Sequence, residues 1–279
     1  METIKFTFIQ AFLACSISSI IGFLFSLVLY YSNRDQRIIS SFLNFCFILP
    51  VIFISFGSIY FYSSKGILST LLGWLSIEYD MKIFSLTGII YVTSYFNIAF
   101  NANFFYRKLI NIPDNYLRVL QSNGVPFIKS LRLQLKNYIF SGYSSVIILT
   151  LVFCIGNFTI VYLLSGSPKL TTIELAIYQS IIFEADLKMA ILLGFTQLII
   201  ILLISFSIIT KSKSFYTFTS YKNSFLNLKK NIFLELIFWL IIAYFSIPFL
   251  VLIKGLISFN LGLLISISFL KSLLNSLLV

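Results

Sequence analysis

The side chains that carry most enzyme chemistry are scarce in this sequence. It contains no histidine, and its three cysteines, Cys15, Cys46 and Cys154, each stand alone in an apolar stretch rather than in pairs spaced as zinc ligands. The common nucleophile–histidine triads are therefore excluded. No glycine-rich loop ending in Gly-Lys-Ser or Gly-Lys-Thr is present to cradle the phosphates of ATP. We therefore expect no catalytic residue, no metal site and no bound cofactor in this chain.

Several amide side chains stand inside long apolar stretches, and four of them are our candidates. Asn97 and Asn101 are four residues apart, so they share one face of a helix, while Asn157 and Gln197 lie in later stretches. Polar groups in lipid are costly, and they are often retained because they line a transport pathway. The alternative is that they join neighbouring helices by hydrogen bonds. We take these four amides as candidate pathway residues and leave that alternative open.

Residues 171–179 read TTIELAIYQ. They contain threonines suited to the start of a helix and a single acid, Glu174. Thr172 stands where a threonine caps a helix, and Glu174 stands near the positive end of the helix dipole. We expect a short outer or re-entrant helix that supports a gate. Thr172, Glu174 and Gln179 are its candidate gate residues, and a solvated loop is the alternative.

A long basic stretch between two apolar runs, residues 106–137, also carries a pattern. Pro113 and Asp114 suit the first turn of a helix. Gly124 suits a helix end, because glycine adopts the left-handed conformation freely. The stretch therefore predicts a short helix, a glycine turn and a second short helix. Such a loop is either a docking element for a cytoplasmic partner or a solvated loop that fixes topology.

The elements that position these residues must lie in a membrane. Of the 279 residues, 59% are hydrophobic and 10% are charged. A soluble domain carries about 25% charged residues. The composition therefore excludes a cytosolic enzyme, a nucleic-acid module and a disordered regulator, and it predicts an all-α polytopic membrane protein.

Six apolar runs are long enough for a helix to cross the roughly 30 Å hydrocarbon core. They comprise residues 6–31, 38–62, 83–105, 138–164, 189–210 and 232–253. We expect a kink at Pro50 and close helix packing at Gly156 and Gly194. A seventh stretch, 256–279, is interrupted by Lys271, so it either spans the bilayer or lies at its surface.

The charges of the loops predict the orientation of the chain. The 20 Lys and Arg residues against 9 Asp and Glu residues give a net charge of +11. The loops after the first, third and fifth runs are basic, whereas the alternate loops are neutral or slightly acidic. The positive-inside rule therefore places the basic loops in the cytoplasm and the N-terminus outside.

The loop around Gly124 resembles the cytoplasmic signature of ABC importer permease subunits. In that family Glu-Ala-Ala is followed, after three residues, by Gly. Here Leu117, Leu120 and Gly124 keep the spacing, while Arg118-Val119-Leu120 stands in place of Glu-Ala-Ala. Three further stretches resemble the thiamine-type permeases of the family: IQAF at 9–12, ILPVIFISFGSIYFYSSKGILSTLL at 48–72, and TTIELAIYQ at 171–179.

The resemblance implies a type I (MetI-like) importer permease in the bacterial inner membrane, with a core of five helices and one or two further helices. It implies that loop 106–137 is a coupling helix that docks on a separate ATPase, which would hold ATP and Mg²⁺. The residues implied in that contact are Pro113, Asp114, Leu117, Arg118, Leu120 and Gly124. A periplasmic substrate-binding protein is implied on the outer side, near Thr172, Glu174 and Gln179.

The same resemblance divides the chain into three parts. Residues 6–210 correspond to a first permease core, 211–231 to a basic cytoplasmic linker, and 232–279 to the incomplete start of a second permease half. A second half or a second copy is therefore expected as a partner. The expected function is import of thiamine or its phosphates, driven by the ATPase. The alternatives are a ferric-iron or other small-solute permease, and a membrane fragment that does not transport.

Overall fold

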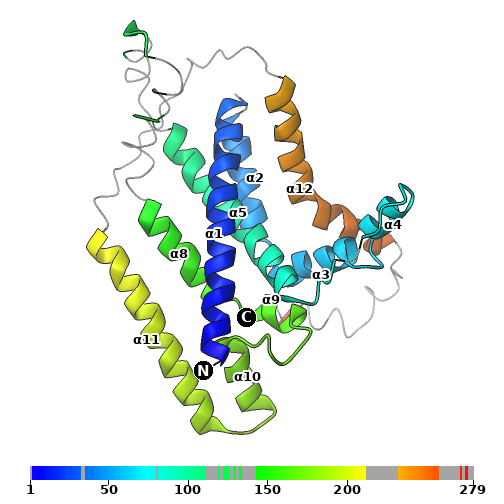
Figure 1. Ribbon diagram of the computed structural model, residues 1–279, viewed down its shortest axis with the longest axis vertical. Coiled ribbons are helices and arrows are strands. Elements are labelled where there is room, and N and C mark those ends of the chain that lie inside the picture. The colour runs from blue at the N-terminus through cyan, green and yellow to red at the C-terminus, as the bar shows by residue number, and fades with distance from the viewer. Residues whose placement is uncertain are drawn as a thin grey trace.

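The structure is a computed structural model that describes residues 2–32, 35–79, 81–110, 143–211 and 232–257, with positions 119, 122–125, 129, 132–133, 271 and 274–275. The elements in this part of the chain are helices (Figure 1). In chain order they are α1 (Glu2–Tyr31), α2 (Gln36–Ile48), α3 (Val51–Tyr62), α4 (Ile67–Gly73), α5 (Leu86–Ile110), α8 (Tyr143–Ile155), α9 (Phe158–Leu164), α10 (Ile173–Ile182), α11 (Leu187–Lys211) and α12 (Ile232–Ile257). Most of the predicted linker and of stretch 256–279 lies outside the described residues.

Several of these helices are long and apolar enough to cross a bilayer. They are Glu2–Tyr31, Val51–Gly73, Leu187–Phe206 and Leu234–Val251. The pair α8 and α9 passes the same test as one span bent by 47°. The predicted all-helical membrane fold is therefore confirmed.

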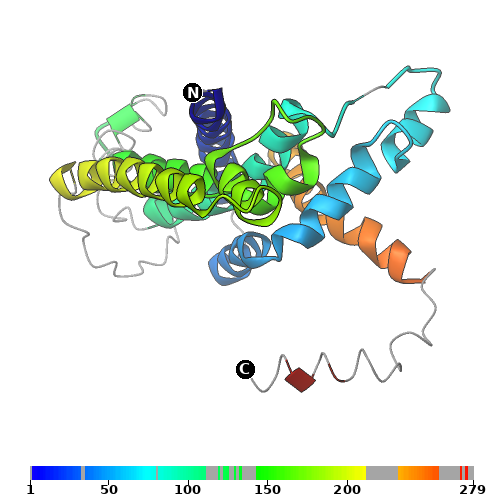
Figure 2. The same cartoon turned by 90° about the horizontal axis from the view of Figure 1, so that it is seen from below.

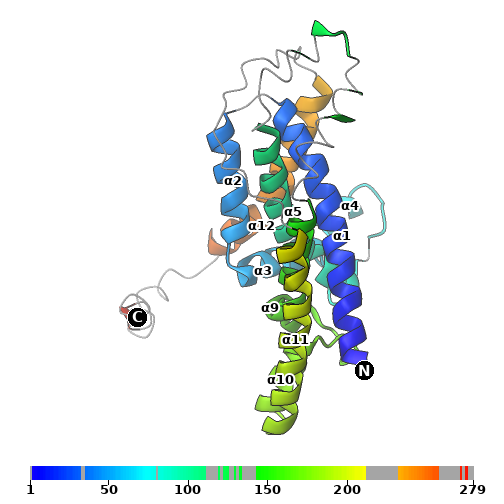
Figure 3. The same ribbon diagram turned by 90° about the vertical axis from the view of Figure 1, so that its left-hand side faces the viewer.

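Helix α5 lies at the centre of the bundle, with α1 alongside it (Figures 1 and 3). Of its 25 residues, 16 are buried. The two helices run parallel, because Ser94 of α5 contacts the carbonyl of Ala14 and Asn101 lies beside Gly22. A Cβ on Gly22 would stand 2.7 Å from the Cβ of Asn101 and 3.1 Å from the backbone nitrogen of Ala102. The absent side chain of Gly22 thus sets how closely these helices approach.

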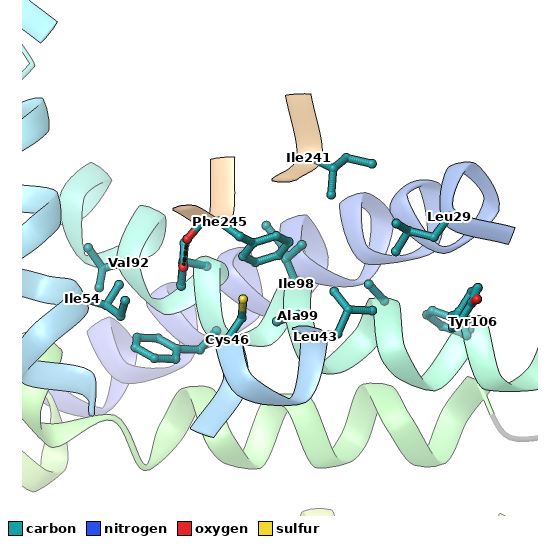
Figure 4. Close-up of a cluster of buried hydrophobic side chains, with 14 of the residues drawn as sticks. Leu29, Leu43, Cys46, Ile54, Val92, Ile98, Ala99, Tyr106, Ile241 and Phe245 are labelled. Atoms are coloured by element: carbon teal, nitrogen blue, oxygen red, sulfur yellow. Dashed lines mark hydrogen bonds between the residues drawn. The ribbon is translucent and has the colours of Figure 1, made fainter. Parts of the chain in front are cut away.

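The apolar core fills the space between α2, α5 and α12 (Figure 4). Leu43 and Cys46 of α2, Ala99 of α5, and Phe245 of α12 are each fully buried. The hydroxyl of Tyr95 in α5 donates a hydrogen bond to the carbonyl oxygen of Phe245 at 2.6 Å. This bond joins the first part of the chain to α12.

Prolines bend two of the membrane helices. The predicted kink at Pro50 is a full break, because α2 ends at Ile48 and α3 starts at Val51 and turns away from α2 (Figures 1 and 2). Pro248 lies inside α12, where it removes one backbone donor from the helix. Gly57 of α3 packs on that proline, since a Cβ there would lie 2.8 Å from the Pro248 carbonyl oxygen. Helices α3 and α12 therefore pack together at the Pro248 bend.

Two predictions about glycines are wrong. A Cβ on Gly194 would meet nothing within 4 Å, so this glycine is not a close-packing site. Gly156 is exposed, and a Cβ there would meet its neighbours only at ordinary contact distances of 3.5 and 3.6 Å. Gly156 instead lies where the fourth apolar run breaks into α8 and α9. This run contains no proline, and the Gly156-Asn157 pair is the signal in the sequence for the break.

We predict opposite effects for alanine at two glycines within membrane helices. Gly22→Ala pushes α1 away from the backbone of α5 and lowers the free energy of unfolding by about 1–3 kcal/mol. Gly194→Ala, the matched control, faces open space and raises it by about 0.5–1 kcal/mol through helix propensity. Reversible unfolding in detergent measures both values. Equal effects of the two variants would contradict close packing at Gly22.

Candidate translocation site

The two asparagines predicted to share a face of α5 both point to α8. The amide nitrogen of Asn97 donates to the sulfur of Cys154 at 3.2 Å and to the backbone carbonyl of Thr93 at 3.0 Å. The side-chain oxygen of Asn101 accepts a bond from the hydroxyl of Thr150 at 3.0 Å. Both asparagines are buried. Their shared face is therefore a polar contact between α5 and α8.

The third predicted amide, Asn157, lies at the break between α8 and α9. Its amide nitrogen donates to the hydroxyl of Thr93 at 2.6 Å. Thr93 thus connects to Asn157 through its hydroxyl and to Asn97 through its carbonyl. We name Thr93, Asn97 and Asn157 the break cluster, because they tie the broken span to α5.

The fourth amide, Gln197 of α11, contacts the predicted gate acid. Its amide nitrogen donates to the Glu174 carboxylate at 2.8 Å. The backbone N–H of Phe158, the first residue of α9, also acts on this carboxylate and lowers its pKa. Asn157 makes no side-chain capping bond to α9. The acid on α10 therefore lies against the start of α9, which has no side-chain cap of its own.

The Glu174 carboxyl is half-buried on α10, which is too short to cross a bilayer. Burial raises the pKa of this carboxyl above its ordinary value of 4.5, and its bonds with Gln197 and Phe158 partly oppose that rise. A negative charge here is thus held by neutral donors at the junction of α9, α10 and α11.

The prediction that the Thr172 side chain caps α10 is wrong. Thr172 is the residue before α10, but its side chain makes no capping bond. The hydroxyl of Thr7 on α1 accepts the Ile173 N–H at 3.0 Å instead. A tertiary contact has replaced the local cap, so α1 fixes the start of α10.

The third gate candidate, Gln179, is half-buried near the end of α10. Its backbone carbonyl accepts bonds from Phe183 and Glu184 at 2.9 and 3.2 Å. These bonds close the last turn of the helix. A gating role for its side chain stays a prediction.

Of the predicted coupling residues, Gly124 is the one that the structure describes. It is exposed and has a φ of +65°, the left-handed conformation expected of a glycine helix stop. The others, Pro113, Asp114, Leu117, Arg118 and Leu120, lie outside the described residues. The turn is thus confirmed at Gly124, and the docking role of the loop stays a prediction.

Sequence reasoning missed the hydroxyl residues that complete these contacts. Thr93 stands four residues before Asn97, and Asn101 follows after four more. This spacing was the available signal, because all three positions share a helix face. Thr150 and Thr7 carried no such signal, since single threonines are ordinary in apolar runs.

The curated relatives that match the chain are thiamine permeases. No protein-family model matches the chain. The chain is 31% identical over 206 residues to the thiamine transport system permease protein ThiP of Haemophilus influenzae, which covers 72% of the chain and 38% of that relative. The ThiP of Escherichia coli (strain K12) is 29% identical over 71% of the chain and 37% of its own length. The chain therefore spans less than two fifths of the curated relatives it matches.

The structural comparison agrees on the fold. A crystal structure of a bacterial ABC transporter involved in the import of the acidic polysaccharide alginate matches with a TM-score of 0.63 at 16% identity, over 77% of this chain and 79% of that chain. The same transporter in complex with an alginate-pentasaccharide-bound periplasmic protein matches with a TM-score of 0.62 at 16% identity, over 74% and 75%. The predicted importer-permease fold and the resemblance to thiamine-type permeases are confirmed.

The raised pKa of the Glu174 carboxyl predicts how the stability of the protein depends on pH. The folded protein holds this proton more tightly than the unfolded chain, so its contribution to stability is lost as pH rises from about 4.5 through the folded pKa. Glu174→Gln removes this dependence. We therefore expect the melting temperature of the parent, relative to E174Q, to fall between pH 4.5 and 7.5 in detergent. A difference in melting temperature that stays constant, or that rises, between pH 4.5 and 7.5 would contradict a raised pKa of Glu174.

Proposed function

We propose that this chain, an ABC importer permease by fold and a relative of thiamine permeases by sequence, passes thiamine or its phosphates across the bacterial inner membrane into the cytoplasm. The observation that carries the proposal is the 31% identity to a thiamine permease over 206 residues. Its relatives are transport subunits, and the sequence holds no ATP-binding loop. The driving energy therefore comes from a separate ATPase, and the chain itself is not an enzyme.

Glu174 gives this substrate a chemical basis. Thiamine carries a permanent positive charge on its thiazolium ring. The Glu174 carboxylate accepts a hydrogen bond from the Gln197 amide and lies near the Phe158 backbone N–H, and both groups are neutral. Its negative charge is therefore not cancelled by these groups, and a passing cation would lower its electrostatic energy. We assign Glu174 the role of meeting the thiazolium ring on the outer side.

The predicted amides position the Glu174 carboxylate and the helices around it. Gln197 holds it from α11, while Asn157 and Asn97 hold the broken span to α5. Asn101 pairs with Thr150, which supports helix packing as its role. We therefore propose that the pathway runs past the break between α8 and α9.

The proposed partners follow from the importer plan. The ATPase docks on loop 106–137, and the left-handed conformation of Gly124 supports this because a glycine helix stop requires it. A substrate-loaded periplasmic protein approaches near α10, as the alginate transporter is crystallised with its own periplasmic protein. A second permease half, or a second copy of this chain, completes the pathway.

A second substrate class has one observation in its favour. The structural neighbour imports an acidic polysaccharide, so this fold accepts chemically different solutes. Ferric iron or another small solute therefore remains the alternative cargo. The uptake test below separates the two by its choice of labelled solute.

We predict that cells carrying this chain with its ATPase and binding protein take up radiolabelled thiamine, and that Glu174→Gln lowers the rate about tenfold or more. The glutamine keeps an oxygen for Gln197 and Phe158, so folding persists while the charge is lost. Glu78→Gln, at an exposed acid in the loop after α4, leaves uptake unchanged. Membrane abundance of each variant is measured by immunoblot.

Two outcomes count against these assignments. Parent cells that take up no thiamine but do take up ferric iron would overturn the substrate. Thiamine uptake by E174Q at the parent rate would remove Glu174 from the pathway while leaving the substrate in place.

A further inference from the structure

Four polar side chains form one hydrogen-bonded group where the end of α5 meets the start of α2. Arg107 donates from Nε and Nη2 to the Ser40 hydroxyl at 3.2 and 3.0 Å, and from Nε to the Asn103 side-chain oxygen at 3.3 Å. Ser40 donates to the same Asn103 oxygen at 3.0 Å, and the Asn103 amide donates to Asn44. We name Ser40, Asn44, Asn103 and Arg107 the α2–α5 polar group.

This group fixes a positive charge and leaves it without a hydrogen-bonded acid among the described residues. Arg107 is exposed, yet its guanidinium is held by three bonds rather than free in solvent. Within the described part of the chain, its hydrogen-bond partners are Ser40 and Asn103, which are neutral. A guanidinium fixed in this way presents its remaining donors to an anion, and its planar fork suits phosphate.

A second cation lies on the same side of α2. Arg37 stands three residues before Ser40 and seven before Asn44, so all three share one face of the helix. Its side chain is exposed. The neighbouring acid, Asp35, accepts a bond from the Arg37 backbone N–H at 2.8 Å as the cap of α2. The face therefore carries two cations and one nearby carboxylate, so its charge is positive among the described residues.

An apolar strip runs along α2 beside this face. Ile38, Phe45 and Ile48 are 70%, 55% and 76% exposed. They follow at intervals of seven and three residues, so they form one stripe next to the polar one. A molecule with an anionic head and an apolar chain would contact the basic face with its head and this apolar strip with its chain.

The charge pattern of the loops places this end of α5 at the cytoplasmic surface, where anionic phospholipids attract basic residues. Figure 3 shows the start of α2 and the end of α1 at the same end of the molecule. We propose that the α2–α5 polar group binds the phosphate of an anionic phospholipid in the cytoplasmic leaflet, with Arg107 as the principal contact. The acyl chains of that lipid lie along Ile38, Phe45 and Ile48.

Native mass spectrometry of the full chain in detergent tests this directly. Phosphatidylglycerol or phosphatidylcholine is added at equal concentration, and the bound fraction is measured. We expect the parent to bind phosphatidylglycerol in preference, and Arg107→Gln to lower that binding about fivefold or more without changing phosphatidylcholine binding. Lys65→Gln, at an exposed lysine in the loop after α3, is the matched control and binds as the parent does.

Arg107→Lys and Ser40→Ala keep the test valid if R107Q does not fold. The lysine variant keeps the charge and should bind within about threefold of the parent, and S40A should weaken binding about twofold because the guanidinium loses an anchor. Equal losses in R107Q and K65Q, or no preference for phosphatidylglycerol, would overturn the proposal. It would also fall if R107Q kept full lipid binding but no longer co-purified with the ATPase, which would assign Arg107 to a protein contact.

Discussion

Helix α5 must carry its polar side chains through a medium that offers them no water. Thr93, Asn97 and Asn101 follow at intervals of four, and lipid would leave each of them unsatisfied. Neighbouring helices therefore have to supply partners. Helix α8 and the start of α9 do so through Thr150, Cys154 and Asn157, while the amide nitrogen of Asn101 has no hydrogen-bond partner among the described residues. On another side, α1 reaches α5 through Gly22. The central position of α5 follows from both constraints.

The same constraint explains how the bundle tolerates broken helices. A break frees backbone groups, which lipid cannot satisfy, so non-helical backbone at this depth must be covered by protein. At the α8–α9 break, the Glu174 carboxyl lies close to the Phe158 N–H, and the Asn157 side chain binds Thr93 of α5. Near Pro248 of α12, the Tyr95 hydroxyl donates to the Phe245 carbonyl. These two sites are thus paired with a polar side chain from another helix, and the proposed pathway lies at the first of them.

Features with local causes could be predicted from the sequence. Run length predicts α1, α11, α12 and the bent pair α8 and α9 as spans. The run 38–62 is instead two helices, and Leu86–Ile110 is not among the helices long and apolar enough to cross a bilayer. The spacing of Asn97 and Asn101 predicts their shared face, and the left-handed turn at Gly124 follows from glycine alone. Features with tertiary causes could not. The partners of Glu174 lie 23 and 16 residues away in the chain, and the capping role of Thr172 was taken by Thr7. The coupling residues before Gly124 lie outside the described residues.

Helix α5 holds the broken span by the hydrogen bond between Thr93 and Asn157. A double-mutant cycle with Thr93→Val and Asn157→Leu measures this bond as a coupling in the free energy of unfolding. Thr93 is buried and Asn157 is half-buried, and the bond between their side chains is 2.6 Å long, so we predict a coupling of about 1 kcal/mol. Free energies that add to within about 0.3 kcal/mol would contradict it, because the break would then be held without α5.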